Sequence, residues 1–198
     1  MKRWNWFLAL GILLATGQAW GADGGVVFTK GAKIVTVSVG GGANLDLPAL
    51  EGRRTDLSLL NTSLRLGYLP FDPVGSGPLR GSFEVGIEPF VQLYLEPSTA
   101  TAEGVKAVGR YHVLPFAPIV PYAEFAMGVM HSNLGVKELR SRHVFSLEGG
   151  VGVSYLLTPS LALTGGYRFQ HLSNAGTEDP NVGINSSTGI LGASFFFK

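Results

Sequence analysis

Regular alternation of apolar and polar side chains is the feature that most restricts the fold of this chain. Between residues 81 and 95 every second side chain is apolar, and those between are mostly polar or small, including Glu84 and Glu88. A period of two is the signature of a β-strand with different surroundings on its two faces. No apolar run after residue 22 is long enough to form a spanning helix, and the richest one, Phe116–Met130, is interrupted by two prolines.

The same alternation recurs in eight segments, each near the roughly 9–11 residues that a tilted strand needs to cross a membrane. The segments are residues 31–42, 57–68, 80–95, 103–114, 121–131, 143–157, 160–173 and 184–197. An even number of antiparallel strands can close without leaving an unpaired edge in the bilayer. We therefore predict an all-β fold, an eight-stranded antiparallel transmembrane β-barrel. The alternative is a soluble β-sandwich, whose strands are usually shorter and whose exposed faces carry more Lys and Glu.

The N-terminus predicts export. Lys2 and Arg3 precede an apolar run, and small residues follow it at the spacing that a signal peptidase recognises. We expect residues 1–21 to be a signal peptide and residues 22–198 to form the barrel domain. The alternative is an uncleaved membrane anchor, but the apolar run is shorter than the roughly 20 residues that a spanning helix needs.

Composition argues against several classes of function. Charged residues make up 15% of the chain, below the roughly 25% of soluble domains. A formal net charge of +1 provides no basic face for nucleic acid. The chain has no Cys, which excludes disulfides and thiolate metal sites, and it has no zinc spacing, phosphate-binding loop or dinucleotide motif. We expect neither a nucleic-acid partner nor a cofactor.

The polar face of the predicted strands carries charges of both signs and would line the lumen of the barrel. It holds four acids and four bases, Arg65, Glu84, Glu88, Lys106, Arg110, Glu124, Glu148 and Arg168. Paired charges are tolerable in a narrow interior, and eight strands leave room only for side chains. We expect these residues and His112 to fill the barrel, and a transport pore is the weaker alternative.

The last strand and the lengths of the links orient the barrel. The chain ends in an aromatic-rich segment, residues 194–198, similar to the C-terminal signal of bacterial outer-membrane barrels although the last residue is Lys. With both termini on the periplasmic side, the links 43–56, 132–142 and 174–183 become extracellular loops and 69–79 a long periplasmic turn. Basic residues in these loops would bind lipopolysaccharide phosphates or be ordinary surface charges: Arg53, Arg54, Lys137, Arg140 and Arg142.

A His/Ser pair lies at the outer end of the seventh predicted strand. His171 and Ser173 are two residues apart, so their side chains share a face, and by alternation this is the lipid face. Polar side chains facing lipid are costly unless they have a function. A histidine beside a hydroxyl can remove its proton and make it a nucleophile. The similar run His131-Ser132 makes a poor pair, because adjacent residues point to opposite faces.

The run from His171 to Gly176, His-Leu-Ser-Asn-Ala-Gly, followed by Pro-Asn-Val-Gly at 180–183, resembles the lipid A 3-O-deacylase (PagL) family. That resemblance implies an eight-stranded barrel in the bacterial outer membrane that hydrolyses an ester-linked acyl chain of lipid A. It implies His171 as general base and Ser173 as nucleophile. The expected partners are lipid A or lipopolysaccharide and the membrane, and the sequence leaves a homodimer open.

The resemblance also implies how the site stabilises the oxyanion of the transition state. The Asn181 side chain is expected to bind it, and the backbone from Asn174 through Ala175 and Gly176 could supply further N–H donors. One such donor is typically worth about 10²–10³ in rate.

One position departs from the family pattern. The family has a Glu fourteen residues after the His, where this chain has Asn185. An amide can orient the imidazole but cannot stabilise an imidazolium by charge. The sequence therefore predicts a serine esterase of reduced activity, one that recruits Glu178 or Asp179 as the acid, or a non-catalytic structural barrel with a degenerate motif.

Overall fold

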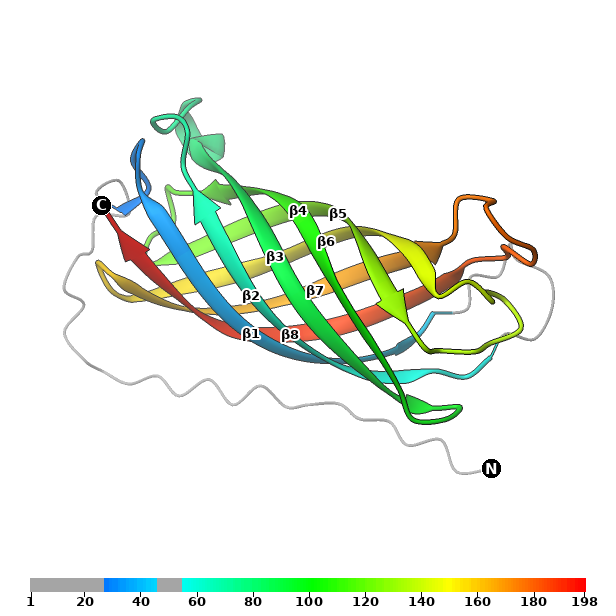
Figure 1. Cartoon of the computed structure of the whole chain (residues 1–198). Coiled ribbons are helices and arrows are strands. Elements are labelled where there is room, and N and C mark those ends of the chain that lie inside the picture. Colours follow the sequence, from blue (N-terminus) through cyan, green and yellow to red (C-terminus); the bar gives the residue numbers. More distant parts are fainter. Residues whose placement is uncertain (1–26, 46–54) are drawn as a thin grey trace.

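The computed structural model describes residues 27–45 and 55–198, and they form one closed antiparallel β-barrel (Figure 1). Each strand pairs with the next in sequence, and β1 pairs with β8 to close the ring. The strands are β1 (Lys33–Asn44), β2 (Ser58–Tyr68), β3 (Gly81–Glu96), β4 (Ala100–Val113), β5 (Ile119–Ser132), β6 (His143–Thr158), β7 (Leu161–Ser173) and β8 (Ile184–Phe197). The predicted eight-stranded barrel is confirmed, and closure rules out the two-sheet alternative.

The links between strands divide the barrel into two ends. The links β3–β4, β5–β6 and β7–β8 lie at one end, here called the loop end, as do Asn44 at the end of β1 and Ser58 at the start of β2. The C-terminus lies at the other, the terminal end, together with the long β2–β3 link that contains the short 3-10 helix η1 (Gly77–Leu79). No helix in the described part of the chain is long and apolar enough to cross a membrane. The predicted signal peptide, residues 1–21, lies outside the described residues and stays a prediction.

The lumen holds a dense network of ion pairs, as predicted. Arg168 bonds three carboxylates, those of Glu88 at 2.7 Å, Glu124 at 2.8 Å and Glu148 at 3.1 Å. Arg65, Lys106 and Arg110 complete the network, and Glu84 pairs with His112 at 2.8 Å. All nine side chains are buried. Such paired charges avoid the cost that an isolated charge would impose in this interior.

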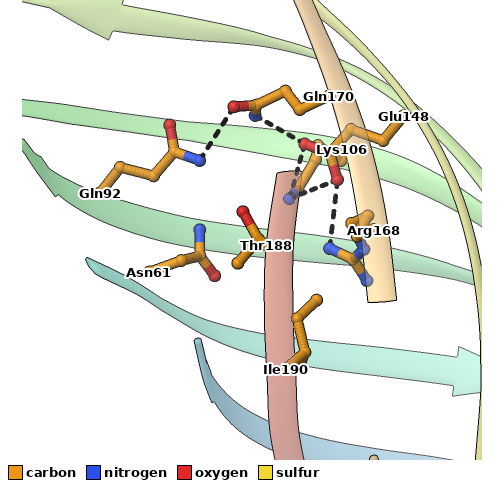
Figure 2. A pocket seen from close by; sticks show the side chains of 8 residues that line it. All are labelled: Asn61, Gln92, Lys106, Glu148, Arg168, Gln170, Thr188 and Ile190. Atoms are coloured by element: carbon orange, nitrogen blue, oxygen red, sulfur yellow. Dashed lines mark hydrogen bonds and ion pairs between the residues drawn. The ribbon is translucent and has the colours of Figure 1, made fainter. Parts of the chain in front are cut away.

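Apolar clusters close the lumen on both sides of this network. Phe28, Leu69, Val120 and Phe196 belong to the cluster at the terminal end. A second cluster fills the loop end and includes Tyr94 and Leu139 from two different segments. Between them, the polar cavity drawn in Figure 2 measures only about 10 Å³, which is room for about one water molecule. Among the described residues, side chains therefore fill the lumen between the two clusters.

The outward face of the wall is apolar. On β3, Val85, Ile87 and Val91 are exposed, while Glu84 and Glu88 between them are buried. The same alternation governs the other strands, because successive side chains of a strand point to opposite faces. The outside of the barrel therefore presents the surface expected of a wall in contact with lipid.

Candidate active site

His171 and Ser173 lie on the outward face of β7, at its loop end. Both side chains are half-buried, and the residue between them, Leu172, is buried in the lumen. His171 lies directly opposite Asn185 on β8, and Ser173 lies directly opposite Phe145 on β6. The strand register thus places the imidazole and the hydroxyl two residues apart on one face of β7, the face turned away from the lumen.

The amide of Asn185 orients the imidazole of His171. The distance from His171 Nδ1 to Asn185 Oδ1 is 2.7 Å. Because a carbonyl oxygen only accepts, Nδ1 carries the proton in this arrangement, and in the neutral ring Nε2 is then the acceptor. The cross-strand pairing therefore leaves Nε2 as the basic nitrogen. The carboxylates of Glu178 and Asp179 are exposed in the β7–β8 loop, and neither replaces Asn185 at Nδ1.

The β7–β8 loop is organised around Asn174, which is fully buried. Its backbone N–H donates to Asn181 Oδ1 at 2.9 Å, and its own Oδ1 accepts from the Gly176 N–H at 2.9 Å. Two of the expected oxyanion donors, the N–H groups of Asn174 and Gly176, are therefore already used inside the loop. No described residue accepts a hydrogen bond from the Ala175 N–H or from the Asn181 side-chain amide, so these two donors remain for a ligand.

Small residues in this loop are required by the backbone. Ala175 has a φ of 53° and Gly176 a φ of 75°, so two successive residues adopt the left-handed conformation. A left-handed non-glycine residue is uncommon and costs roughly 1–3 kcal/mol, a strain that tends to occur at functional sites. This bend begins two residues after Ser173, the last residue of β7.

The backbone at Gly183 lies close to the imidazole of His171. Its φ is 74°, and a Cβ built on it would lie 2.8 Å from His171 Cε1 and 3.3 Å from Nε2. Glycine is the one residue that combines this φ with the absence of a side chain. In the sequence, Gly183 is the last residue of the family-like motif and had no assigned role. The structure shows that a side chain at this position would meet the His171 imidazole.

Replacing Gly183 by alanine should therefore displace the imidazole. We expect Gly183→Ala to lower hydrolysis of an ester substrate by about 10–100-fold, since a misplacement of about 1 Å can cost about 10²-fold. Gly176→Ala is the matched control, because its φ is also positive, at 75°, but nothing lies within 4 Å of the added Cβ. Steady-state kinetics of the two detergent-solubilised variants measure the difference. Equal losses would mean that backbone strain, not contact with His171, causes the effect.

Glu138 joins three segments at the loop end. Its carboxylate accepts hydrogen bonds from the Thr55 N–H and hydroxyl, both at 2.8 Å, and its backbone carbonyl accepts from the Val182 N–H at 3.0 Å. The next residue, Leu139, forms an isolated antiparallel bridge with Asn181. The β5–β6 loop therefore fixes the segment that carries Asn181. Sequence inspection missed Glu138, because its partners lie 83 and 44 residues away.

The hydrogen bonds that join Glu138 to Thr55 and Val182 are here called the Glu138 clamp, and acid should weaken those that its carboxylate accepts from Thr55. Burial alone would raise the pKa of the Glu138 carboxyl, but the hydrogen bonds from Thr55 outweigh it and lower the pKa below its usual value. A group whose pKa is lower in the folded state stabilises that state above the unfolded pKa, and the effect is lost as pH falls through the folded pKa. Protection of the loop amides, measured by hydrogen exchange and corrected for the intrinsic fall of the exchange rate with pH, should decrease on acidification in wild type. Glu138→Gln cannot titrate, so its loop protection should lack this acid-dependent decrease.

An apolar groove begins next to Ser173 on the outer wall. Phe145, Val129 and Val105 follow Ser173 in one row of directly opposed residues across β6, β5 and β4. They line a groove of about 320 Å³. The row of directly opposed residues continues through β3, β2, β1 and β8 and meets β7 again at Leu163. Leu163 lies ten residues nearer the terminal end than Ser173, where the row began. The groove therefore descends along the wall from the hydroxyl toward the terminal end.

Other predicted site residues are placed as follows. His131 is exposed on the outer wall and Ser132 is buried, so the two point to opposite faces as expected. Arg53 and Arg54 lie outside the described residues. Lys137, Arg140 and Arg142 are in the β5–β6 link at the loop end. No cluster of three metal-binding side chains occurs within residues 27–45 and 55–198.

Comparison with known proteins gives one matching family and several similar structures. The family model described as lipid A 3-O-deacylase (PagL) matches residues 72–194. The crystal structure of the outer-membrane enzyme PagL aligns with a TM-score of 0.57 and 21% identity, covering 80% of this chain and 97% of that one. The crystal structure of Neisserial surface protein A aligns with a TM-score of 0.53 and 20% identity, covering 85% of this chain and 99% of that one. The N-terminal barrel domain of Pseudomonas aeruginosa OprF aligns with a TM-score of 0.51 and 15% identity, covering 85% of this chain and 98% of that one. No curated protein sequence matches the chain.

Proposed function

The chain belongs to the lipid A 3-O-deacylase family of bacterial outer-membrane β-barrels, and we propose that it cleaves its lipid by serine esterase chemistry at Ser173. The observation that carries the proposal is the pairing of His171 with Asn185 on the outward face, two residues before Ser173. The 2.7 Å hydrogen bond from His171 Nδ1 to Asn185 Oδ1 leaves Nε2 as the base. In this proposal the substrate is an ester-linked 3-hydroxyacyl chain of lipid A in the outer leaflet.

The reaction follows two steps. Ser173 Oγ attacks the ester carbonyl while His171 Nε2 takes the hydroxyl proton, and the tetrahedral oxyanion then collapses and expels the sugar oxygen, which takes that proton from Nε2. Water, deprotonated by Nε2, attacks the resulting acyl-serine, and Ser173 leaves with the proton. The products are a free fatty acid and a lipid A with a free hydroxyl.

Two donors would hold the oxyanion. The Ala175 N–H and the Asn181 side-chain amide are the expected donors not used within the loop, and both belong to the β7–β8 link, which begins directly after Ser173. Preorganised donors of this kind stabilise charge that develops only in the transition state. The clamp by Glu138 supports the role of Asn181, because it fixes the neighbouring Val182.

The direction of the groove fits a membrane substrate. With the loop end at the cell exterior, Ser173 lies near the outer boundary of the hydrocarbon layer. The row Phe145, Val129, Val105 then descends into the bilayer. A chain whose ester lies at the hydroxyl would follow this apolar wall without leaving the membrane. Within the described residues, the polar cavity of the lumen is far smaller, at about 10 Å³.

Mass spectrometry of lipid A tests the proposal in cells. Expression of wild type should remove one 3-hydroxyacyl chain, and His171→Ala should leave lipid A intact. Leu163→Ala is a matched control on the same face of β7, ten residues nearer the terminal end than Ser173, and should act as wild type. Identical lipid A in cells with and without the protein would reject the proposal.

One observation favours a second candidate, a non-catalytic structural barrel. Asn185 supplies an amide where the family has a carboxylate, and the described loop carboxylates do not reach Nδ1. In the serine-protease template, the corresponding change from Asp to Asn costs about 10⁴ in turnover. The lipid A experiment separates the two candidates, because a scaffold leaves lipid A unchanged in every variant.

A further inference from the structure

We propose that His131 and His143 form a binding site for a divalent transition metal, of which Zn²⁺ is the representative, on the outer wall of the barrel. The two residues are directly opposed on β5 and β6, and both are exposed. The site lies at the loop end and is distinct from the His171 imidazole. It does not depend on the esterase proposal.

The spacing of the two ring nitrogens carries the argument. His131 Nδ1 lies 3.3 Å from His143 Nε2, and the ring centroids are 4.9 Å apart. The contact is a long hydrogen bond between the two rings. Two nitrogens bound to one tetrahedral Zn²⁺ at about 2.0–2.1 Å also lie about 3.3 Å apart. The same separation therefore suits one shared cation, which would replace the hydrogen bond.

The backbone holds both histidines in place. His131 and His143 belong to the last rung of the β5–β6 ladder, and the Ser132 N–H donates to the Arg142 carbonyl at 2.7 Å just beyond it. Ser141 Oγ accepts from the His143 N–H at 3.3 Å and donates to the His143 carbonyl at 2.9 Å. Ligands on paired strands keep their geometry better than ligands on loops.

Glu103 extends the site by one strand. It lies directly opposite His131 on β4, on the side away from His143, and it is exposed. Directly opposed Cβ atoms are about 4.5–5.5 Å apart, so the Glu103 carboxylate can reach a water bound to the metal. Glu103, His131 and His143 all line the groove next to Phe145, which leaves space for such a water. Imidazole pairs with carboxylate support are typical of zinc and similar metals.

Zinc binding to the purified, folded barrel tests the proposal. The probe is Zn²⁺ alone, with bound metal measured by elemental analysis after desalting and affinity by calorimetry. We expect one Zn²⁺ per chain, lost in His131→Ala and in His143→Ala. His171→Ala should keep it, because that imidazole lies outside the site. Glu103→Gln should weaken binding by about tenfold, the lower end of the effect of outer partners of metal ligands.

Each alternative result overturns the proposal or a named part of it. Equal zinc in wild type and both histidine variants would show nonspecific binding. Loss of zinc in His171→Ala alone would place the metal at the esterase site instead. Unchanged affinity in Glu103→Gln would remove Glu103 from the site. Heat-modifiable migration on gels verifies that each variant is a folded barrel, and the two histidines and Glu103 are exposed, so folding should be unaffected.

Discussion

Ser173→Ala should lower the rate of ester hydrolysis by the purified protein by about 10⁴-fold or more, with little change in stability. The hydroxyl is half-buried on the outer wall and makes no hydrogen bond to another described residue, so its removal should leave the barrel intact. When a serine hydrolase loses its nucleophile, nearly all of its rate enhancement is lost. The enhancement that remains comes from substrate binding and oxyanion stabilisation. The measurement is kcat on a micellar ester substrate.

Ser187→Ala is the matched control for this prediction. Ser187 lies two residues beyond Asn185 on the same outward face of β8, opposite Phe169, and it is half-buried like Ser173. We expect its kcat to remain within about twofold of wild type. Comparable activity in Ser173→Ala and wild type would contradict the nucleophile assignment. Parallel losses in both serine variants would indicate a general effect on the wall.

Asn185→Asp should raise the hydrolysis rate, by up to about 10⁴-fold. Aspartate has the shape of asparagine, so its oxygen can keep the 2.7 Å contact with His171 Nδ1. A carboxylate at this place stabilises the imidazolium that forms when Nε2 takes the serine proton. Asn185→Glu restores the residue type of the family, but its extra methylene moves the carboxylate away from the position of the Asn185 Oδ1 that contacts His171 Nδ1. We therefore expect a smaller gain from glutamate than from aspartate.

Two further results interpret the Asn185 series. Asn185→Leu removes the acceptor and should reduce any basal rate, because the ring loses the contact that orients it. A gain in Asn185→Asp that also requires Ser173 would identify a working but weakened catalytic site. Absence of hydrolysis in wild type, Asn185→Asp and Asn185→Glu alike would instead support the structural barrel.

The fold could be predicted because each strand carries its own evidence. Alternation in a segment such as residues 81–95 specifies both that it is a strand and which face meets lipid. The predicted ends of the strands are close to those observed, and β4 begins three residues earlier, at Ala100, because the β3–β4 link is short. Charge balance on the polar face likewise predicted a filled lumen, since unpaired charges there would be too costly.

The candidate site could be predicted only where it is local. His171 and Ser173 share a face by spacing alone, but the contact between His171 and Asn185 depends on the register between β7 and β8. The loop hydrogen bonds also reversed part of the expectation, since the N–H groups of Asn174 and Gly176 are used internally.

Sequence by itself determined the strands, their lipid and lumen faces, and the outward position of the His/Ser pair, because a period of two is a property of each segment. Only the tertiary structure decided which residues of different segments meet. The Glu138 clamp, the approach of Gly183 to the imidazole and the pairing of His131 with His143 all cross between strands or loops. Closure of the barrel sets these contacts, because the stagger between neighbouring strands depends on all eight strands at once. The packing of the loops depends on that stagger.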